Sequence, residues 1–126
     1  MKKIVTTKNA PAPIGPYNQA VLSGNMLFIS GQIAFNVKTQ LLEKDNIVDE
    51  TNLVMQNLKA ILNKAGLEFE NVVKTSIFIK NMDDFTTINS VYASYFNAET
   101  APARETVEVA RLPKDVNVEI SMIAMQ

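Results

Sequence analysis

The chain has 126 residues, of which 47% are hydrophobic and 20% charged, a composition typical of a folded domain rather than a disordered segment. Its 12 basic and 13 acidic residues give a net charge of −1, which excludes a generally basic nucleic-acid binder. The sequence has no cysteine and no histidine. Thiol nucleophiles, disulfides, thiolate metal sites, imidazole bases and the Ser-His-Asp triad are therefore excluded. Acid–base chemistry has to come from Asp, Glu, Lys, Tyr, the main chain or water.

The sequence shows no internal repeat and no linker, so we expect one domain over residues 1–126. The first residues lack the apolar run of a secretory signal, and no window reaches the roughly 18 apolar residues of a membrane span. A cytoplasmic protein is the expectation.

The first part of the chain predicts short strands around a rigid loop. Residues 2–7 favour a strand, and the proline cluster at 11–16 favours a loop. Residues 19–22 and 26–30 are β-rich and are separated by Ser-Gly-Asn, the pattern of a hairpin. Residues 36–48 lack periodicity and are expected to form a loop.

Two helices follow. The first is predicted over residues 49–65, with Asp49 as its N-cap and Gly66 just beyond its end. The second opens at Asp83 or Asp84 and runs to about residue 96. Each has an apolar stripe at helical spacing: Val54, Leu58, Ile61, Leu62 and Ala65 in the first, and Phe85, Ile88, Tyr92 and Tyr95 or Phe96 in the second.

Three later strands complete the pattern. They are expected at 72–79, with Val73, Thr75, Ile77 and Ile79 on one face, near 104–110 and near 116–124. The order β-β-β-α-β-α-β-β predicts an α+β fold with about six strands and two helices covering one face of the sheet.

The last strand indicates what lies on the other face. Its alternate residues Val116, Val118, Ile120, Met122 and Ala124 are apolar, whereas the opposite set mixes Asn117, Glu119, Ser121, Ile123 and Met125. Such a face is either covered by another subunit or exposed to solvent.

Arginine usage singles out one region. Ten of the twelve basic residues are lysine, and the two arginines, Arg104 and Arg111, lie seven positions apart. Arginine provides a planar, bidentate donor for a carboxylate or phosphate, and Arg104 stands where a loop becomes a strand. The alternative is a structural ion pair with Glu105, Glu108 or Glu119.

Glu119 is a carboxylate inside an otherwise apolar strand. It is either a solvated outward residue or a functional one, whose pKa burial would raise and a nearby arginine would lower. If the last two strands form a hairpin around Pro113, Glu119 and Arg104 come close on one sheet face.

Three other positions have both structural and functional interpretations. Tyr17 follows the rigid loop and either offers its hydroxyl to a cleft or anchors the loop on the core. Ser30 and Gly31 end a strand, where glycine permits close approach of the main chain to a ligand. The residues alone indicate one α+β domain with a possible Arg–Glu site, and they do not specify the reaction.

Several blocks resemble the RidA/YjgF family, also labelled the endoribonuclease L-PSP family. They are Ala12 to Tyr17 (APIGPY), Ser30 to Ile33 (SGQI), Lys74-Thr75, Asn81 to Phe85 (NMDDF), Pro102 to Arg104 (PAR), Val107 to Asp115 (VEVARLPKD) and Val118 to Ile120 (VEI). Their order and spacing extend over essentially the whole chain.

This resemblance implies a chorismate-mutase-like α+β subunit, a homotrimer with active sites between subunits, and a reaction without cofactor or metal. The slightly acidic charge and the absence of a membrane span argue against nucleic-acid and membrane partners. The resemblance implies hydrolysis of 2-aminoacrylate and 2-iminobutanoate to 2-keto acids and ammonia. Arg104 would bind the substrate carboxylate and Glu119 would activate water or protonate the leaving amine. The cleft would be lined by Tyr17, Ser30, Gly31, Asn89 and Thr106.

Two positions depart from the family pattern. Thr106 stands where many relatives have cysteine, and Glu105 stands where the family usually has a small residue. Strand alternation places Glu105 opposite Arg104, although a negative charge so close to the anion-binding group would weaken substrate binding. The alternative functions are a single-strand endoribonuclease or translation inhibitor, and a non-enzymatic module that binds small carboxylates.

Overall fold

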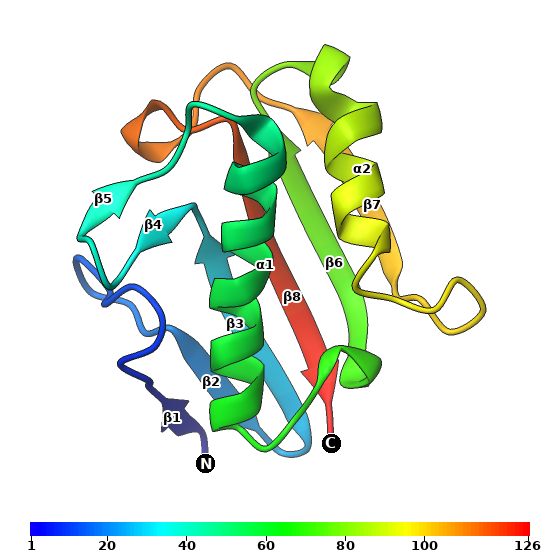
Figure 1. Ribbon diagram of the computed structural model, residues 1–126. Coiled ribbons are helices and arrows are strands. Elements are labelled where there is room, and N and C mark those ends of the chain that lie inside the picture. Colours follow the sequence, from blue (N-terminus) through cyan, green and yellow to red (C-terminus); the bar gives the residue numbers. More distant parts are fainter.

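A computed structural model describes all residues, 1–126, and places six strands in one mixed sheet with both helices on one face (Figure 1). The sheet order is β1-β2-β3-β8-β6-β7. Its strands are β1 (Lys3–Val5), β2 (Ala20–Ser23), β3 (Met26–Gln32), β6 (Val72–Ile79), β7 (Ala103–Glu108) and β8 (Val118–Met125). The helices are α1 (Ile47–Lys64) and α2 (Phe85–Ala93). The expected α+β fold is confirmed. Neither helix has the length and apolar character of a membrane-spanning segment.

Helix α1 lies across the middle of the sheet and supplies much of the core (Figure 1). The predicted N-cap Asp49 is wrong, because the side chain of Asn46 accepts hydrogen bonds from the main-chain N–H groups of Val48 and Asp49. Gly66 has φ 76°, as expected for the residue after a helix.

The first strands form the predicted hairpin, with Ser23 paired to Met26 and Gly24 in the turn at φ 60°. The segment expected to be a loop at 36–48 differs in part: β4 (Phe35–Asn36) and β5 (Leu41–Leu42) form a separate two-stranded sheet there. Each of these strands has two residues, too few to show an alternating pattern.

Strand β6 has the predicted bounds, but one predicted side-chain orientation is wrong. Val73 is 42% exposed, and a register shift between Val72 and Lys74 turns Val72 into the core instead. Thr75 lies in the core as expected, fully buried.

Strand β7 corrects the expected hairpin of the last two strands. It pairs in parallel with β6, and β8 lies on the other side of β6, paired antiparallel to both β6 and β3. Arg104 is level with Thr75 on β6 and so lies on the helix side. Glu119 is level with Phe78, on the opposite face of the sheet. The two side chains are thus not neighbours within one chain.

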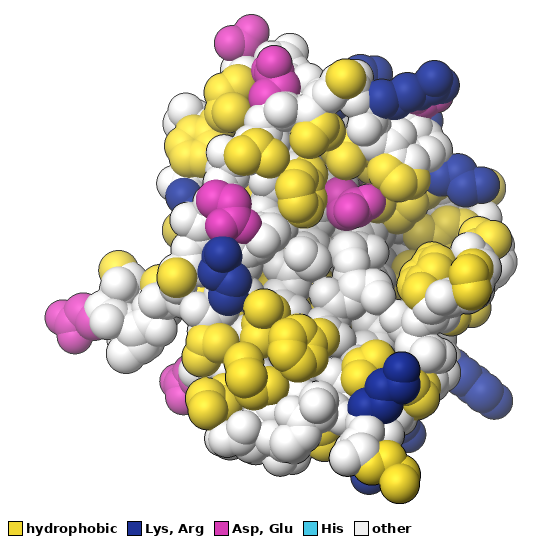
Figure 2. Space-filling view, turned by 180° about the vertical axis from the view of Figure 1, so that it is seen from behind, with side chains coloured by type: hydrophobic (Ala, Val, Ile, Leu, Met, Phe, Trp, Pro, Cys, Tyr) yellow, Lys and Arg dark blue, Asp and Glu magenta, His cyan; other side chains and the backbone are white.

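Figure 2 shows the sheet face that no helix covers, where hydrophobic side chains gather in patches between charged ones. Ile4, Phe28 and Val107 on this face are 40–44% exposed. We call it the open face. Its apolar side chains are of the kind that a partner surface covers.

Candidate functional site

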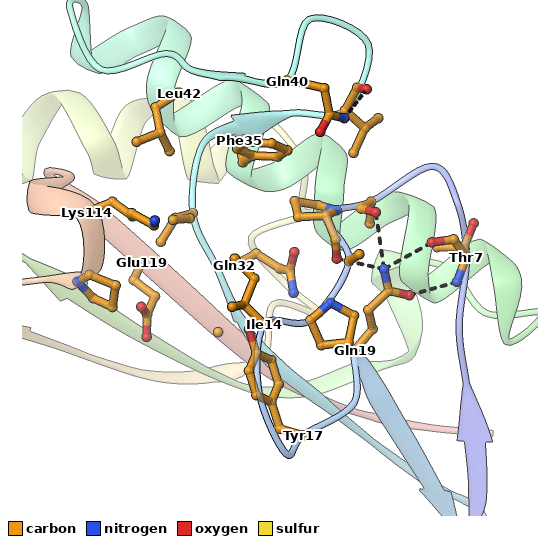
Figure 3. Close-up of a pocket in the computed structure, with 18 of the residues that line it drawn as sticks. Thr7, Ile14, Tyr17, Gln19, Gln32, Phe35, Gln40, Leu42, Lys114 and Glu119 are labelled. Carbon is orange, nitrogen blue, oxygen red and sulfur yellow. Dashed lines mark hydrogen bonds between the residues drawn. The ribbon is translucent and has the colours of Figure 1, made fainter.

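One cavity on the chain contains Glu119 at one end. It has a volume of about 860 Å³ and is bordered by the loop before β2, the end of β3, the β4–β5 segment and the turn before β8. In Figure 3 the side chains of Tyr17, Ile14, Phe35, Lys114 and Glu119 surround this space.

The proline-rich loop presents Tyr17 through local main-chain geometry. Gly15 has φ 120°, a value that favours glycine, and its carbonyl accepts a 2.9 Å hydrogen bond from the Tyr17 N–H. The Tyr17 hydroxyl accepts a 3.2 Å hydrogen bond from the N–H of Ile14. Tyr17 is half exposed and borders the cavity with its ring, while its hydroxyl is bonded within the loop, so it is neither packed on the core nor free to offer its hydroxyl to the cavity in this chain.

The loop is held by Gln19, a residue that its sequence pattern did not single out. Gln19 is 2% exposed, and its side-chain amide donates to the carbonyls of Thr7, Ala10 and Pro11 at 2.8–3.2 Å while accepting from the N–H of Thr7 (Figure 3). A buried amide with four partners fixes the course of the loop. A glutamine at the start of an apolar strand was the available signal.

Gly31 lies directly against the Glu119 carboxyl group. A Cβ atom at position 31 would come within 2.5 Å of Glu119 Oε2 and 2.8 Å of its Cδ. The β3–β8 register shifts between Ile29 and Gln32, which places Gly31 in an irregular stretch beside Glu119. Glycine at this position is therefore required for the carboxyl group to occupy its observed place.

Glu119 is half-buried, and burial raises the pKa of its carboxyl group above the ordinary value. Neither ion pair of the structure includes Glu119. A carboxyl group whose pKa is raised toward neutrality and which faces a cavity is suited to proton transfer.

Ser30 is not in this cavity. Its hydroxyl donates a 2.6 Å hydrogen bond to the Asn18 carbonyl, and the residue borders a smaller cavity of about 440 Å³ on the open face. Tyr17 borders both cavities and so lies between Ser30 and the larger one. Within one chain the structure brings together Tyr17, Gly31 and Glu119, with Ser30 adjacent.

Arg104 belongs to a second cluster, which we call the arginine cluster and which consists of Arg104, Asn89, Phe85 and Tyr92. The guanidinium donates a 2.6 Å hydrogen bond from Nη1 to Asn89 Oδ1. It lies 5.8 Å from the ring centroid of Phe85 and 5.1 Å from that of Tyr92. These partners stand at positions i, i+4 and i+7 of α2, so one helix face holds the arginine.

The expected alternative, an ion pair between Arg104 and a glutamate, does not occur. The two ion pairs of the structure are Lys74–Glu105 and Arg111–Asp115. The guanidinium therefore keeps donors for an external anion.

Thr106 lies two residues beyond Arg104 on the same face of β7. Its Oγ1 atom is buried and has no hydrogen-bond partner. The N–H of Val109 donates to Ile79 on β6, so alternation turns the main-chain N–H of Thr106 toward the free edge of the sheet. Thr106 thus has a free main-chain N–H beside Arg104, whereas its hydroxyl is buried.

Glu105 points away from Arg104, as strand alternation predicts. Its carboxylate pairs with Lys74 at 2.7 Å and accepts a hydrogen bond from Ser76. These hydrogen bonds, that of Lys74 first, lower the pKa of Glu105. Its charge is therefore balanced by Lys74 on the open face.

The predicted site residues therefore form two half-sites on opposite faces of the sheet. One holds Tyr17, Gly31 and Glu119, and the other holds Asn89, Arg104 and Thr106. The structure contains no group of three or more acidic side chains that would hold a metal ion.

Comparisons with known proteins agree on one family. The family model described as Endoribonuclease L-PSP matches residues 7–126. A RutC family protein of Pyrococcus horikoshii is 52% identical over 98% of both chains. The 2-iminobutanoate/2-iminopropanoate deaminase of Escherichia coli is 47% identical over 100% of this chain and 99% of its own. A Rid-family crystal structure from Yersinia pestis, of unknown function, superimposes over the full length of both chains with a TM-score of 0.97 and 44% identity. The chain therefore belongs to the endoribonuclease L-PSP family, the YjgF/RidA proteins.

Proposed function

We propose that this protein is a cytoplasmic deaminase that hydrolyses 2-imino acids and their enamine tautomers to 2-keto acids and ammonia. Its substrates would be small, such as 2-aminoacrylate and 2-iminobutanoate. The resemblance to the Escherichia coli deaminase supports this reaction.

The observation that carries the proposal is that Arg104 and Glu119 both lack an ionic partner. Arg104 has donors for a carboxylate, and Glu119 has a burial-raised pKa and faces a cavity. One group is suited to hold the acid end of a 2-imino acid, and the other to move a proton at its C=N bond.

The reaction needs water, a positioned carbonyl-like carbon and a proton carrier. Glu119 would take one proton from water as the oxygen attacks the imine carbon and would pass it to the nitrogen, which gives a carbinolamine. It would then move the remaining hydroxyl proton to the nitrogen as the C–N bond breaks, so that C=O forms and ammonia leaves. Arg104, with the main-chain N–H of Thr106, would hold the carboxylate throughout. No redox change occurs, since C=N is exchanged for C=O and one water molecule is consumed.

A second copy of the chain would complete each site. Arg104 and Glu119 are separated by β6 and lie on opposite faces, so a small substrate does not reach both groups in one chain. We propose a homotrimer in which the arginine cluster of one copy faces the Glu119 cavity of the next. The apolar side chains of the open face favour such an assembly.

The direct test is release of 2-ketobutyrate when the purified protein is added to a threonine dehydratase reaction. We expect faster keto-acid release, unchanged by a metal chelator. Absence of acceleration, together with RNA cleavage that survives Arg104→Ala, would instead support a ribonuclease.

The shared site has its own test, in which Arg104→Ala and Glu119→Gln chains are co-refolded at equal amounts. Random assembly would give about a quarter of the sites both intact groups, so about a quarter of the parent activity should return. Sedimentation as a monomer at all concentrations, or a mixture as inactive as its components, contradicts the shared site.

A further inference from the structure

Glu50 is a buried carboxylate that the proposed chemistry does not use. It is fully buried in the first turn of α1, where the helix dipole favours a negative charge. Both of its oxygens bind one residue: Oε2 accepts a 2.7 Å hydrogen bond from the main-chain N–H of Asn117, and Oε1 accepts a 2.7 Å bond from Asn117 Nδ2. No ion pair neutralises it.

Asn117 is also held from two other sides. Its carbonyl accepts a 3.0 Å hydrogen bond from the N–H of Lys80, and its Nδ2 lies 3.3 Å from the Lys44 carbonyl. A single residue just before β8 is thus fastened to α1, to the end of β6 and to the segment before α1. We call the Glu50–Asn117 pair the clasp.

In the sequence, Asn117 of the clasp lies between a strained turn and Glu119, the candidate acid–base group. Lys114 and Asp115, before it, both have left-handed main-chain conformations, with φ 60° and 56°. Such conformations are unfavourable for non-glycine residues, so surrounding contacts must hold the turn. Pro113 and Lys114 border the same cavity as Glu119, which follows Asn117 by two residues.

On the β3 side, strand pairing gives Glu119 little support. The pairing of β8 with β3 is irregular between Ile29 and Gln32, beside Glu119. The position of its carboxyl group against Gly31 therefore depends on how β8 begins.

We propose that Glu50, acting through Asn117, is a positioning residue that holds Glu119 in its half-buried place in the cavity and holds Pro113 and Lys114 in the wall of the same cavity. The inference rests on the deaminase function proposed above. Neither residue of the clasp touches substrate in this proposal.

The test compares three charge-neutral variants. Asn117→Ala breaks half of the clasp. The double variant Glu50→Gln/Asn117→Asp restores the contact between these two residues with reversed polarity, because the glutamine amide then donates to the new carboxylate, and it loses only the 3.3 Å contact with the Lys44 carbonyl. Asn71→Ala is the matched control, since Asn71 Nδ2 donates to the Met125 carbonyl at the far end of β8.

We expect Asn117→Ala to lower kcat at least fivefold with KM within twofold of the parent, and the double variant to recover kcat to within twofold. Asn71→Ala should lower the melting temperature yet keep kcat. If Asn71→Ala lowers kcat as much as Asn117→Ala for the same loss of stability, the role is structural and the proposal fails. If Asn117→Ala does not fold, Asn117→Ser, which keeps a hydroxyl donor, takes its place.

A second readout does not depend on turnover: an NMR titration of the Glu119 carboxyl group. Breaking the clasp should let the carboxyl group reach water and lower its pKa, and the double variant should return it. The other ionisable residues that border this cavity are Tyr17, Lys8 and Lys114, and none of them is substituted in the three variants. A parent without imine turnover refutes the proposed function alone. An unchanged Glu119 pKa in Asn117→Ala refutes the clasp.

Discussion

The two half-sites differ in how each side chain is supported. Arg104 is an exposed side chain that contacts three residues of one helix face, through one hydrogen bond and two aromatic rings. Its guanidinium is therefore oriented before any ligand binds. Glu119 is half-buried and touched by the main chain at Gly31, with burial as the cause of its raised pKa. The arginine cluster has a guanidinium with donors for a carboxylate but no acid–base group, and the Glu119 half-site has an acid–base group but no arginine. The difference indicates that each half is incomplete alone.

The largest effect should come from removing the proton carrier. Glu119→Gln keeps the shape but cannot take or give a proton, so we expect kcat to fall by about 100-fold or more. The melting temperature should not fall, because no ion pair is lost. Glu70→Gln, an exposed residue away from both half-sites, is the control and should match the parent. Normal turnover by Glu119→Gln would place the acid–base group elsewhere.

The next effect concerns binding. Arg104→Lys keeps the charge but loses the planar fork that contacts Asn89 and would hold a carboxylate. We expect kcat/KM to fall at least tenfold, about 1.4 kcal/mol, mostly through KM. Arg111→Lys is the natural control, as Arg111 is the other arginine and is paired with Asp115 on the surface. Equal effects at both positions would contradict a specific role for Arg104.

Gly31→Ala should perturb the Glu119 half-site alone. The added Cβ would lie 2.5 Å from Glu119 Oε2, and the flexible carboxylate end would move rather than the backbone. We expect kcat to fall by roughly fivefold to tenfold while the melting temperature changes little, as is usual when a flexible group absorbs the clash. Gly24→Ala in the β2–β3 turn is the control for backbone strain without a side-chain clash. Its φ is 60°, which strains an alanine, but its Cβ would meet nothing within 4 Å. Unchanged kcat in Gly31→Ala would mean that the position of Glu119 is not critical.

The raised pKa of Glu119 also predicts a pH dependence of stability. Because the folded state binds this proton more tightly than the unfolded state, the contribution of Glu119 is greatest below the ordinary glutamate pKa and is lost as pH rises through the raised folded value. The parent should therefore lose stability relative to Glu119→Gln across that window. Urea midpoints of both proteins at a series of pH values measure the difference, and a constant difference would contradict the burial of the carboxyl group.

The sequence predicted individual elements well because alternation and helical periodicity are local. The bounds of β6 and the hairpin between β2 and β3 were predictable for that reason. The N-cap of α1 was not, because Asn46 and Asp49 both carry suitable side chains and only the hydrogen bonds decide. The irregular register at Val73 has no sequence signal that we recognise.

The prediction that Arg104 and Glu119 lie close together in one chain was wrong for a different reason. Two strands consecutive in sequence were expected to be neighbours, but β7 follows β6 through α2 and therefore pairs with it in parallel. The strand–helix–strand order was the available signal for that crossover. Proximity across a sheet depends on long-range pairing, so the candidate residues were predictable and their separation into two half-sites was not.

The smallest effect should be at Glu105, the residue that departs from the family pattern beside Arg104. Its carboxylate faces the open side of β7 and is paired with Lys74 and Ser76, whereas Arg104 faces α2. An exposed, neutralised charge on the other side of a strand contributes little to anion binding, and salt screens it further. We expect Glu105→Ala to change KM by less than about twofold at physiological salt. Lys74→Met, which leaves Glu105 unpaired, is the sharper variant, and at low salt it should raise KM more than Glu105→Ala does. A large fall in KM for Glu105→Ala would show that the carboxylate opposes the substrate anion, and that the two faces of β7 are electrostatically coupled.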